Sequence, residues 1–238
     1  MPDAPAPSAC GRLADAVPPP PPYAPPADAG FGRLLHADDA LLVVDKPAGL
    51  LSVPGRGPGK DDCLVRRLRE RYPDALIVHR LDMETSGLIV LARGAAMHRA
   101  LSLAFQRREV EKGYAAVVDG LPAADAGTIA LPLAADWPNR PRQKVDPLSG
   151  KPALTRWRVL ARDPVRGAAR LALEPETGRS HQLRVHLMAI GHPILGDALY
   201  APAPARAKAA RLLLHADCLA FAHPADGRRL AFSCPAPF

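Results

Sequence analysis

Short apolar runs separated by turn-forming residues are the feature of this sequence that most constrains its fold. Runs such as Leu41–Val44 and Leu171–Leu173 are followed by charged residues or proline within a few positions. A helix that crosses a membrane needs about 18 or more consecutive apolar residues. The sequence therefore predicts a chain without a membrane-spanning helix and without a membrane partner.

The pattern of apolar residues predicts both strands and helices. Strands are predicted over Leu41–Asp45, Leu76–Val78, Leu88–Ala92, Tyr114–Val118, Leu154–Leu160 and Arg170–Leu173. Helical spacing predicts helices over Asp62–Arg71, Ala95–Arg108 and Ser180–Ile190, the last with an apolar stripe of Leu183, Leu187 and Ile190. Strands in hairpin-like succession with a few interposed helices indicate an α+β fold around a mostly antiparallel sheet.

The first 33 residues differ in composition from the rest of the chain. Pro18–Pro22 is an unbroken proline run, and Tyr23 and Pro25–Pro26 follow it. Proline fixes φ and lacks the backbone N–H, so residues 1–33 are predicted to form a disordered or polyproline tail. Residues 34–238 are then expected to form one domain. A ligand for a proline-recognition domain is the alternative for the tail.

Cysteine content and the N-terminal residues indicate the cellular setting. The four cysteines are sparse and share no short spacing, which argues against a disulfide scaffold and a zinc site. Proline and alanine stand where a secretory signal would carry an apolar core. We therefore expect a reducing, cytoplasmic setting and no bound metal.

Positive charge is concentrated in one segment of the chain. The net charge is +7, and the segment from Arg140 to Arg184 holds 11 Lys and Arg against 4 Asp and Glu. Clustered cations displace counterions from phosphates, which favours a nucleic-acid partner. Most of the basic residues are arginine, so genomic base composition is an alternative explanation. Charge alone does not decide between the two.

A polar loop, His79–Gly87, lies between two predicted strands. It contains Arg80, Asp82 and Thr85 within a few positions. An aspartate held on a loop between buried strands is a candidate nucleophile or base. The alternative is a carboxylate that only caps a turn with Thr85 and Ser86.

A second polar segment, Glu176–His186, lies about 100 residues downstream. Arg184 falls about one turn into a helix predicted from Ser180, and its guanidinium could pair with a distant carboxylate and keep it ionised. His181 and His186 are five residues apart, which is not the i, i+4 spacing of a metal-binding pair. A helix-end role for His181 and a core role for His186 are at least as plausible as catalysis.

Four segments occur in a familiar order: Lys46–Leu50, His79–Gly87, Lys112–Tyr114 and Gly178–His186. Together they resemble the motifs of the RluA family of pseudouridine synthases, with His79–Gly87 matching the catalytic motif. Further segments resemble the dual-specificity members of that family: Leu50–Arg56, Asp136–Pro141, Gly191–Asp197 and Arg211–Ala216. The resemblance extends from Leu34 to the C-terminus.

This resemblance implies both a fold and an activity. The expected fold is an α+β catalytic domain with a central, mixed, mostly antiparallel sheet, flanking helices and an active-site cleft, without an S4-type RNA-binding domain. The expected enzyme is an isomerase that detaches uracil from a uridine in RNA and rejoins it through C5, without metal or organic cofactor. Dual-specificity members act on a tRNA anticodon loop and a 23S rRNA hairpin. No obligatory protein partner is expected, and a monomer is the default.

The resemblance also implies roles for three catalytic residues. Asp82 matches the family's essential aspartate, whose attack on ribose C1′ or on the uracil ring stays open. Arg184 matches the arginine that pairs with this aspartate. Tyr114 matches the tyrosine that stacks on the target base and transfers a proton at C5.

Other residues are expected to bind the substrate. Leu183 matches an apolar residue that lines the uracil pocket, and Arg80 matches a residue that fills the space left when the target base is flipped out. Arg179 and His181 belong to the same motif as Leu183 and are also expected at the substrate. Charge suggests a phosphate-contacting surface formed by Arg140, Arg142, Lys144 and Lys151.

Two other functions compete with this interpretation. A non-catalytic RNA-binding protein of the same fold would have no reason to keep Asp82, Tyr114 and Arg184 together. An unrelated hydrolase that depends on Asp82 would need a second spaced carboxylate or metal ligands, which the motifs lack.

Overall fold

The computed structural model describes residues 23–238. Its strands are β1 (Arg33–Ala37), β2 (Leu41–Lys46), β3 (Ala75–Ile77), β4 (Ser86–Arg93), β5 (Glu111–Asp119), β6 (Ala126–Ile129), β7 (Leu133–Ala135), β8 (Gln143–Val145), β9 (Thr155–Asp163), β10 (Ala168–Pro175), β11 (Leu214–Ala222) and β12 (Arg229–Ser233). Its helices are α1 (Leu64–Arg69), α2 (Gly94–Arg107), α3 (Gln182–Ala189) and α4 (Ala203–Ala207), with a 3₁₀ turn at Trp137–Asn139.

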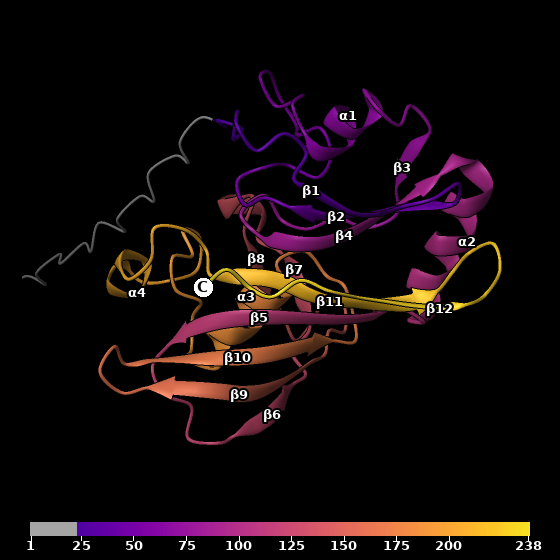
Figure 1. The fold of residues 1–238 in the computed structure, drawn as a ribbon. Coiled ribbons are helices and arrows are strands. Elements are labelled where there is room, and N and C mark those ends of the chain that lie inside the picture. The colour runs from indigo at the N-terminus through magenta and orange to yellow at the C-terminus, as the bar shows by residue number, and fades with distance from the viewer. Residues whose placement is uncertain (1–22) are drawn as a thin grey trace, which may run out of the picture.

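One ten-stranded sheet runs through the described part of the chain (Figure 1). Its strand order is β1-β2-β4-β11-β5-β10-β9-β6, while β12 pairs with β11 and β3 pairs with β4. The pair β4–β11 is parallel, and the other pairs of this sheet are antiparallel. A separate hairpin, β7–β8, forms a two-stranded sheet. The mixed, mostly antiparallel sheet of the predicted α+β fold is confirmed.

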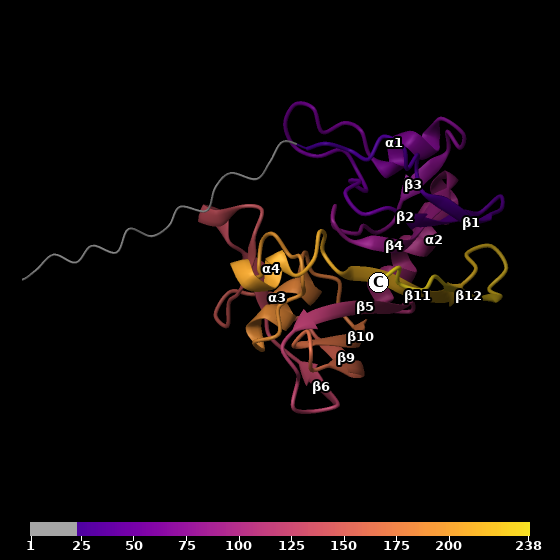
Figure 2. The ribbon, with the colours of Figure 1, turned by 60° about the vertical axis from the view of Figure 1, so that its left-hand side comes forward.

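Two main apolar clusters fill the two halves of the molecule. The first packs α1 and α2 against β2 and β4, through residues such as Leu64, Leu88 and Leu101. The second packs α3 against β5 and β10, through residues such as Leu171 and Leu187. The halves lie on opposite sides of β11 in Figures 1 and 2. The parallel pair β4–β11 therefore joins two separately packed halves into one sheet.

The loop between β3 and β4 emerges where the two halves meet. It leads into Ser86 and Gly87, which pair with His215 and Ala216 of β11. Gly87 has φ +110°, and a Cβ at this position would overlap the backbone of Ala216. A glycine is therefore required for β4 to approach β11 directly after the loop. This close approach holds the loop at the middle of the sheet.

Every predicted strand and helix corresponds to an element of the structure, with shifted ends. One correction concerns α3, which begins at Gln182 instead of Ser180 because His181 has a left-handed backbone, with φ +53°. Ile190 lies beyond the end of α3 and is 36% exposed, so it is not part of a buried stripe. The strands β1, β6, β7, β8, β11 and β12 were not predicted.

Helix α2 is the longest helix of the described residues, with 14 residues. Leu101 is buried, and Met97, Ala104 and Phe105 pack beside it, as their spacing predicts. Within residues 23–238, the helices are too short or too polar to span a bilayer.

The predicted tail divides into two parts. Residues 1–22 lie outside the described residues, so the prediction of disorder there is not tested. Tyr23 donates its hydroxyl hydrogen to the Asp62 carbonyl (2.9 Å) and accepts the Leu51 N–H (3.2 Å). Arg67 donates to the carbonyl of Pro26 (2.9 Å). Tyr23 and Pro26 thus contact the domain, although the prediction placed both in the tail.

Candidate active site

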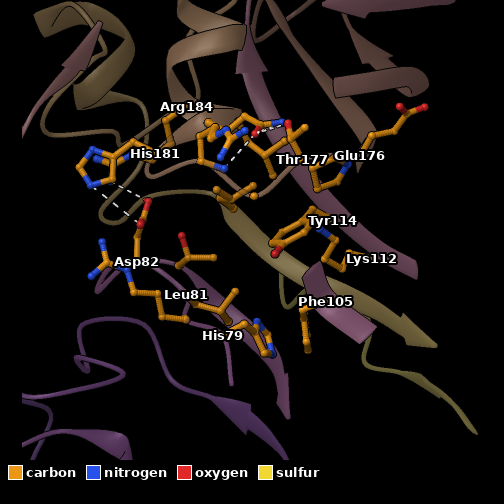
Figure 3. Close-up of a pocket in the computed structure, with 18 of the residues that line it drawn as sticks. His79, Leu81, Asp82, Phe105, Lys112, Tyr114, Glu176, Thr177, His181 and Arg184 are labelled. Carbon is orange, nitrogen blue, oxygen red and sulfur yellow. Dashed lines mark hydrogen bonds and ion pairs between the residues drawn. The ribbon is translucent and has the colours of Figure 1, made fainter. Parts of the chain in front are cut away.

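A cleft of about 550 Å³ lies between the two halves of the sheet (Figure 3). The β3–β4 loop forms one wall, and the segment from Pro175 to Arg184 forms the other. The C-terminal end of α2 and the start of β5 close one end. All three predicted catalytic residues, Asp82, Tyr114 and Arg184, line this cleft.

Arg184 lies between two carboxylates. Its Nη1 donates to Asp82 Oδ2 at 3.3 Å, while its Nε and Nη2 donate to Asp197 at 2.8 and 2.7 Å. The side chain of Arg184 is 4% exposed, that of Asp197 is fully buried and that of Asp82 is 19% exposed. The two-point contact with Asp197 fixes the plane of the guanidinium, so its third nitrogen, Nη1, is directed at Asp82.

The buried carboxylate of Asp197 also has backbone hydrogen-bond partners. Asp197 Oδ1 accepts the backbone N–H groups of Leu199 (2.9 Å) and Tyr200 (3.1 Å). Burial by itself would lower the pKa of Arg184, but the hydrogen bonds and charge of Asp197 and the charge of Asp82 raise it above its usual value. Arg184 is therefore a permanent cation beside Asp82, and a turn-capping role for the Asp82 carboxylate is not what the structure shows.

His181 and Tyr200 approach Asp82 from a second direction. The Tyr200 hydroxyl accepts the Gln143 N–H at 2.8 Å and lies 2.6 Å from His181 Nδ1. Burial raises the pKa of Tyr200 to about 12 and lowers the pKa of His181, so a phenol meets a neutral imidazole. The phenol then donates to Nδ1, which leaves the ring hydrogen on Nε2. That nitrogen lies 3.9 Å from Asp82 Oδ1.

Tyr114 and Leu183 also line the cleft, and Figure 3 shows Tyr114 among the residues drawn there. Tyr114 packs against both apolar clusters, and Leu183 is 7% exposed. Burial, together with the nearby charge of Asp82, raises the pKa of Tyr114 above its usual value. The cleft thus presents an apolar wall and a protonated phenol close to an anionic carboxylate.

The loop that carries Asp82 is held in place by hydrogen bonds from residues 46–52. Ser52 Oγ donates to the Leu81 carbonyl at 2.8 Å, and the Gly49 N–H donates to the Met83 carbonyl at 2.9 Å. Lys46 is fully buried, and its ammonium contacts the carbonyl oxygens of Pro47, Leu50 and Met83. Burial lowers the pKa of Lys46 to about 7, against the opposing charges of Asp82 and Glu84. These contacts fix both neighbours of Asp82 in the chain.

The opposite wall is fixed by Gln182 at the start of α3. Its Oε1 accepts hydrogen bonds from Thr177 Oγ1 (2.7 Å) and the Arg179 N–H (3.0 Å), while its Nε2 donates to Leu154 and Thr155. Arg179 donates from Nε to the Pro152 carbonyl at 3.1 Å, and its side chain is exposed at the cleft. Arg179 is therefore placed at the edge of the cleft, not at its floor.

Arg80 is exposed at the cleft and donates to Ser180 Oγ at 3.3 Å. This contact joins the two walls above Asp82. The second histidine of the downstream segment, His186, is fully buried and bonds with Thr155 and Leu131. The core interpretation of His186 is confirmed.

The four predicted phosphate-contacting residues lie on or beside the β7–β8 hairpin. Arg140 and Lys144 are exposed, Arg142 is half-buried against Tyr200, and Lys151 bridges to Leu133 of β7. None of them lines the cleft. They form a separate cationic surface next to the catalytic residues.

Within residues 23–238, Asp45, His215 and Cys234 place three ligand atoms within 4.8 Å of one another. Both ring nitrogens of His215 are already engaged, with Ser86 Oγ at 2.9 Å and the Cys234 carbonyl at 3.0 Å. Cys234 Sγ also contacts Asp45 at 3.2 Å. A metal ion would have to displace these hydrogen bonds, so the group is built as a polar network and not as a ligand set.

Sequence reasoning missed four residues of the site: Lys46, Lys112, Asp197 and Tyr200. Lys46, Lys112 and Asp197 stand inside motifs that the resemblance identified, and Tyr200 follows one of them by three residues. Membership of a motif was the only available signal, because the partners of these residues are far away in the chain. Lys112 lines the cleft beside Tyr114.

Comparison with known proteins is consistent with this geometry. A family model described as RNA pseudouridylate synthase matches residues 40–189. The dual-specificity RNA pseudouridine synthase RluA of Escherichia coli K12 is 52% identical over 207 residues, covering 86% of this chain and 93% of the relative. RluA of Pasteurella multocida is 50% identical over 216 residues, covering 91% of this chain and 98% of the relative.

Two solved human structures have the same fold. RNA pseudouridylate synthase domain containing 1 superposes with a TM-score of 0.71 at 29% identity, covering 86% of this chain and 83% of that chain. RNA pseudouridylate synthase domain containing 4 gives 0.67 at 28% identity, covering 86% and 88%. Sequence and fold therefore agree, and this chain belongs to the RNA pseudouridylate synthase family.

Proposed function

We propose that this enzyme converts uridine to pseudouridine in two RNAs, the anticodon loop of a tRNA and a hairpin of 23S rRNA. The observation that carries this proposal is the identity of about one half to RluA enzymes whose names state dual specificity, over nearly their whole length. Single-stranded loops are where sequence-specific RNA recognition is easiest, since their bases can be splayed out.

Asp82 acts as the nucleophile on this proposal. A carboxylate can bond to ribose C1′ or to the uracil ring and leave again, and both routes require it to be ionised. The Arg184 donor at 3.3 Å and the His181 ring nitrogen at 3.9 Å support an anionic Asp82 with oriented oxygens. The remaining exposure of its side chain leaves a path for the substrate.

Asp197 and Tyr200 are positioning residues on this proposal. Asp197 fixes the guanidinium that faces Asp82, and Tyr200 sets the tautomer of His181. Both act through a neighbour and not on the RNA. Reactions that depend on the orientation of one carboxylate are sensitive to such supporting contacts.

On this proposal Tyr114 stacks on the uracil and takes part in proton transfer at C5 of that base. Its aromatic face offers a stacking surface for the uracil. Its hydroxyl is an acid–base group suited to proton transfer at C5 of the uracil. Because its pKa is raised, the free enzyme holds Tyr114 as a phenol. Tyr114 can accept the C5 proton only as a phenolate, so its own proton must first pass to solvent in the open cleft.

The target base must leave its stack to reach this cleft, at a cost of about a few kcal/mol. Arg80 is exposed at the entrance, where a planar guanidinium can take the place of the extruded base. Leu183 then contacts the uracil inside the cleft. Arg179 binds the substrate at the edge of the cleft, and His181 binds it beside Asp82. The cations of the β7–β8 hairpin bind phosphates.

One catalytic domain carries out the reaction on this proposal, in the cytoplasm and without a metal or organic cofactor. The experiment is tritium release from uridine C5 in two separate transcripts, a tRNA anticodon stem-loop and a 23S rRNA hairpin. Each transcript has a matched control in which cytidine replaces the target uridine. Release from both uridine transcripts and from neither control supports the proposal. Release from one transcript alone contradicts dual specificity.

A further inference from the structure

Trp137 is a large aromatic side chain on the surface, and it is 67% exposed. It begins the 3₁₀ turn that connects β7 to β8, in the segment Asp136–Pro141. The Arg140 guanidinium lies over its ring, 3.3 Å from the centroid. One face of the indole is therefore covered by a cation of this chain, while much of the side chain remains open to solvent.

The loop around Trp137 is closed by its own hydrogen bonds. The Asp136 N–H donates to the Arg142 carbonyl (3.0 Å), and the Arg142 N–H donates to the Asn139 carbonyl (3.0 Å). Asn139 Nδ2 donates to Asp136 Oδ2 at 2.9 Å. The aromatic ring is thus presented on a preformed support, which reduces the entropy lost when a ligand binds.

The surroundings of Trp137 are cationic. Arg140, Arg142, Lys144 and Lys151 lie on or beside the same hairpin. Among the ion pairs of residues 23–238, Lys144 is the member of this group that has a carboxylate partner, Asp146 at 3.4 Å. Residues 133–151 hold these four cations against two carboxylates, Asp136 and Asp146. The surroundings of the exposed ring therefore keep a net positive charge, which is complementary to a polyanion.

The hairpin is tied to the catalytic site at two points. The Gln143 N–H of β8 donates to the hydroxyl of Tyr200, which contacts His181. Arg179 at the edge of the cleft donates to the Pro152 carbonyl, next to Lys151. An RNA whose target base enters the cleft therefore passes close to the hairpin.

We propose that Trp137 and Arg140 form a stacking site for an unpaired base of the substrate RNA, outside the catalytic cleft. The site rests on the proposed RNA substrates. The base lies on the open indole surface, and the hairpin cations contact phosphates on either side of it. Stacking tolerates any base, so this site adds affinity for a single-stranded loop without selecting one sequence. Such a contact suits an enzyme that must accept two different loops.

The two tryptophans of the chain provide a direct test. Trp157 lies half-buried on β9 and packs with the second apolar cluster, so it serves as the internal control. A base stacked on Trp137 should quench its fluorescence when an anticodon stem-loop RNA is added. We expect the quench in the wild type and in Trp157→Phe, and its loss in Trp137→Phe. A quench that persists in Trp137→Phe overturns the proposal.

Kinetics give a second readout of the same site. We expect Trp137→Ala to raise KM for the stem-loop about tenfold, equivalent to about 1.4 kcal/mol, with kcat within about twofold of the wild type because the ring does not line the cleft. Val165→Ala, a change at a residue that is 97% exposed on the β9–β10 turn, is the matched control and should leave KM unchanged. An unchanged KM in Trp137→Ala overturns the proposal.

The fluorescence titration separates this inference from the proposed function. It reports RNA binding even if the enzyme releases no tritium, in which case the proposed substrates fail while the stacking site is still tested. The molar mass of wild type and Trp137→Ala in solution should be equal. A lower mass in the variant would show that Trp137 contacts a second protein chain, which would overturn the assignment to RNA.

Discussion

Arginine serves two different purposes in two neighbouring regions of this enzyme. Arg184 is 4% exposed and donates three hydrogen bonds to the carboxylates of Asp82 and Asp197. Arg140 and Arg142 of the hairpin region lie over the rings of Trp137 and Tyr200, at 3.3 and 5.4 Å from the centroids. Arg184 also lies over the Tyr200 ring, at 5.1 Å, so its carboxylate partners are what distinguish it. Each of the three guanidinium nitrogens of Arg184 has a carboxylate partner. Arg140 and Arg142 have no carboxylate partner among residues 23–238 and keep their donors for a ligand.

A buried arginine can orient a catalytic carboxylate, whereas an exposed arginine can attract the phosphates of an RNA. A buried charge is tolerated only when it is paired, and pairing on two sides removes its freedom to move. An exposed cation keeps its mobility and its attraction for phosphates, which salt weakens. Changes in the buried network should therefore affect kcat and stability, and changes in the hairpin should affect KM and its salt dependence.

The largest effect is expected from Arg184→Met, which disrupts the buried network of Arg184, Asp82 and Asp197. The substitution leaves Asp197 buried and unpaired, which should lower the free energy of unfolding by about 3–5 kcal/mol. It also removes the cation beside Asp82, and kcat should fall about a thousandfold or more. Urea unfolding and tritium release measure the two effects.

The double variant Arg184→Met/Asp197→Asn is the control for this test. It removes the unpaired buried charge, so part of the lost stability should return while activity does not. A single variant as stable as the wild type would contradict the account of the Arg184–Asp197 pair.

Tyr114→Phe should reduce activity with less effect on stability. The phenyl ring keeps the stacking surface but has no hydroxyl to accept or deliver a proton, so kcat should fall about 10²–10⁴-fold. KM should stay within about threefold of the wild type, since the ring still packs against the base. A steady-state comparison on the stem-loop measures both values. A raised KM with unchanged kcat would assign Tyr114 to binding alone.

Tyr200→Phe tests the weaker support of Asp82 through His181. The variant removes one hydroxyl, so Nδ1 of His181 loses its donor and the Gln143 N–H loses its acceptor. We expect kcat to fall about tenfold while KM is unchanged, because orientation and not binding is disturbed. Pre-steady-state release rates provide the measurement. An unchanged rate would show that the tautomer of His181 has no influence on Asp82.

The smallest effects are expected from substitutions of the cations on and beside the β7–β8 hairpin. Lys144→Ala and Lys151→Ala should each raise KM two- to threefold near 0.1 M salt and leave kcat unchanged. Each should also reduce the slope of log KM against log salt by about 0.7–0.9, as expected for one lost phosphate contact. Lys60→Ala, on an exposed turn of the other half, is the control. Equal slopes in all variants would remove the hairpin from the RNA-binding surface.

Patterns local to the chain predicted much of this fold. The apolar run at Leu41–Asp45 became β2, and the helical spacing of Met97, Leu101 and Phe105 became α2. These elements have periodicities that a short window contains. The motifs around Asp82 and Arg184 predicted that the two meet, although 102 residues separate them.

Contacts without a local signature could not be predicted. The parallel pairing of Ser86 with His215 joins segments that no pattern relates, and β11 itself went unpredicted. The left-handed backbone of His181 makes α3 begin later than predicted. A histidine at this position gives no sign in the sequence that its φ is positive. The hydrogen bond between Tyr200 and His181 joins residues 19 positions apart that no local pattern relates, so it becomes visible only in three dimensions.

The central claim is that Asp82, oriented by Arg184, carries out the reaction. Tritium release from uridine C5 of a tRNA anticodon stem-loop tests it most directly, with wild type and Asp82→Asn compared at equal folded concentration. The variant is nearly the same size as the wild type but cannot be a carboxylate nucleophile. The account predicts release by the wild type and none above background by Asp82→Asn. Equal release by the two proteins would contradict it.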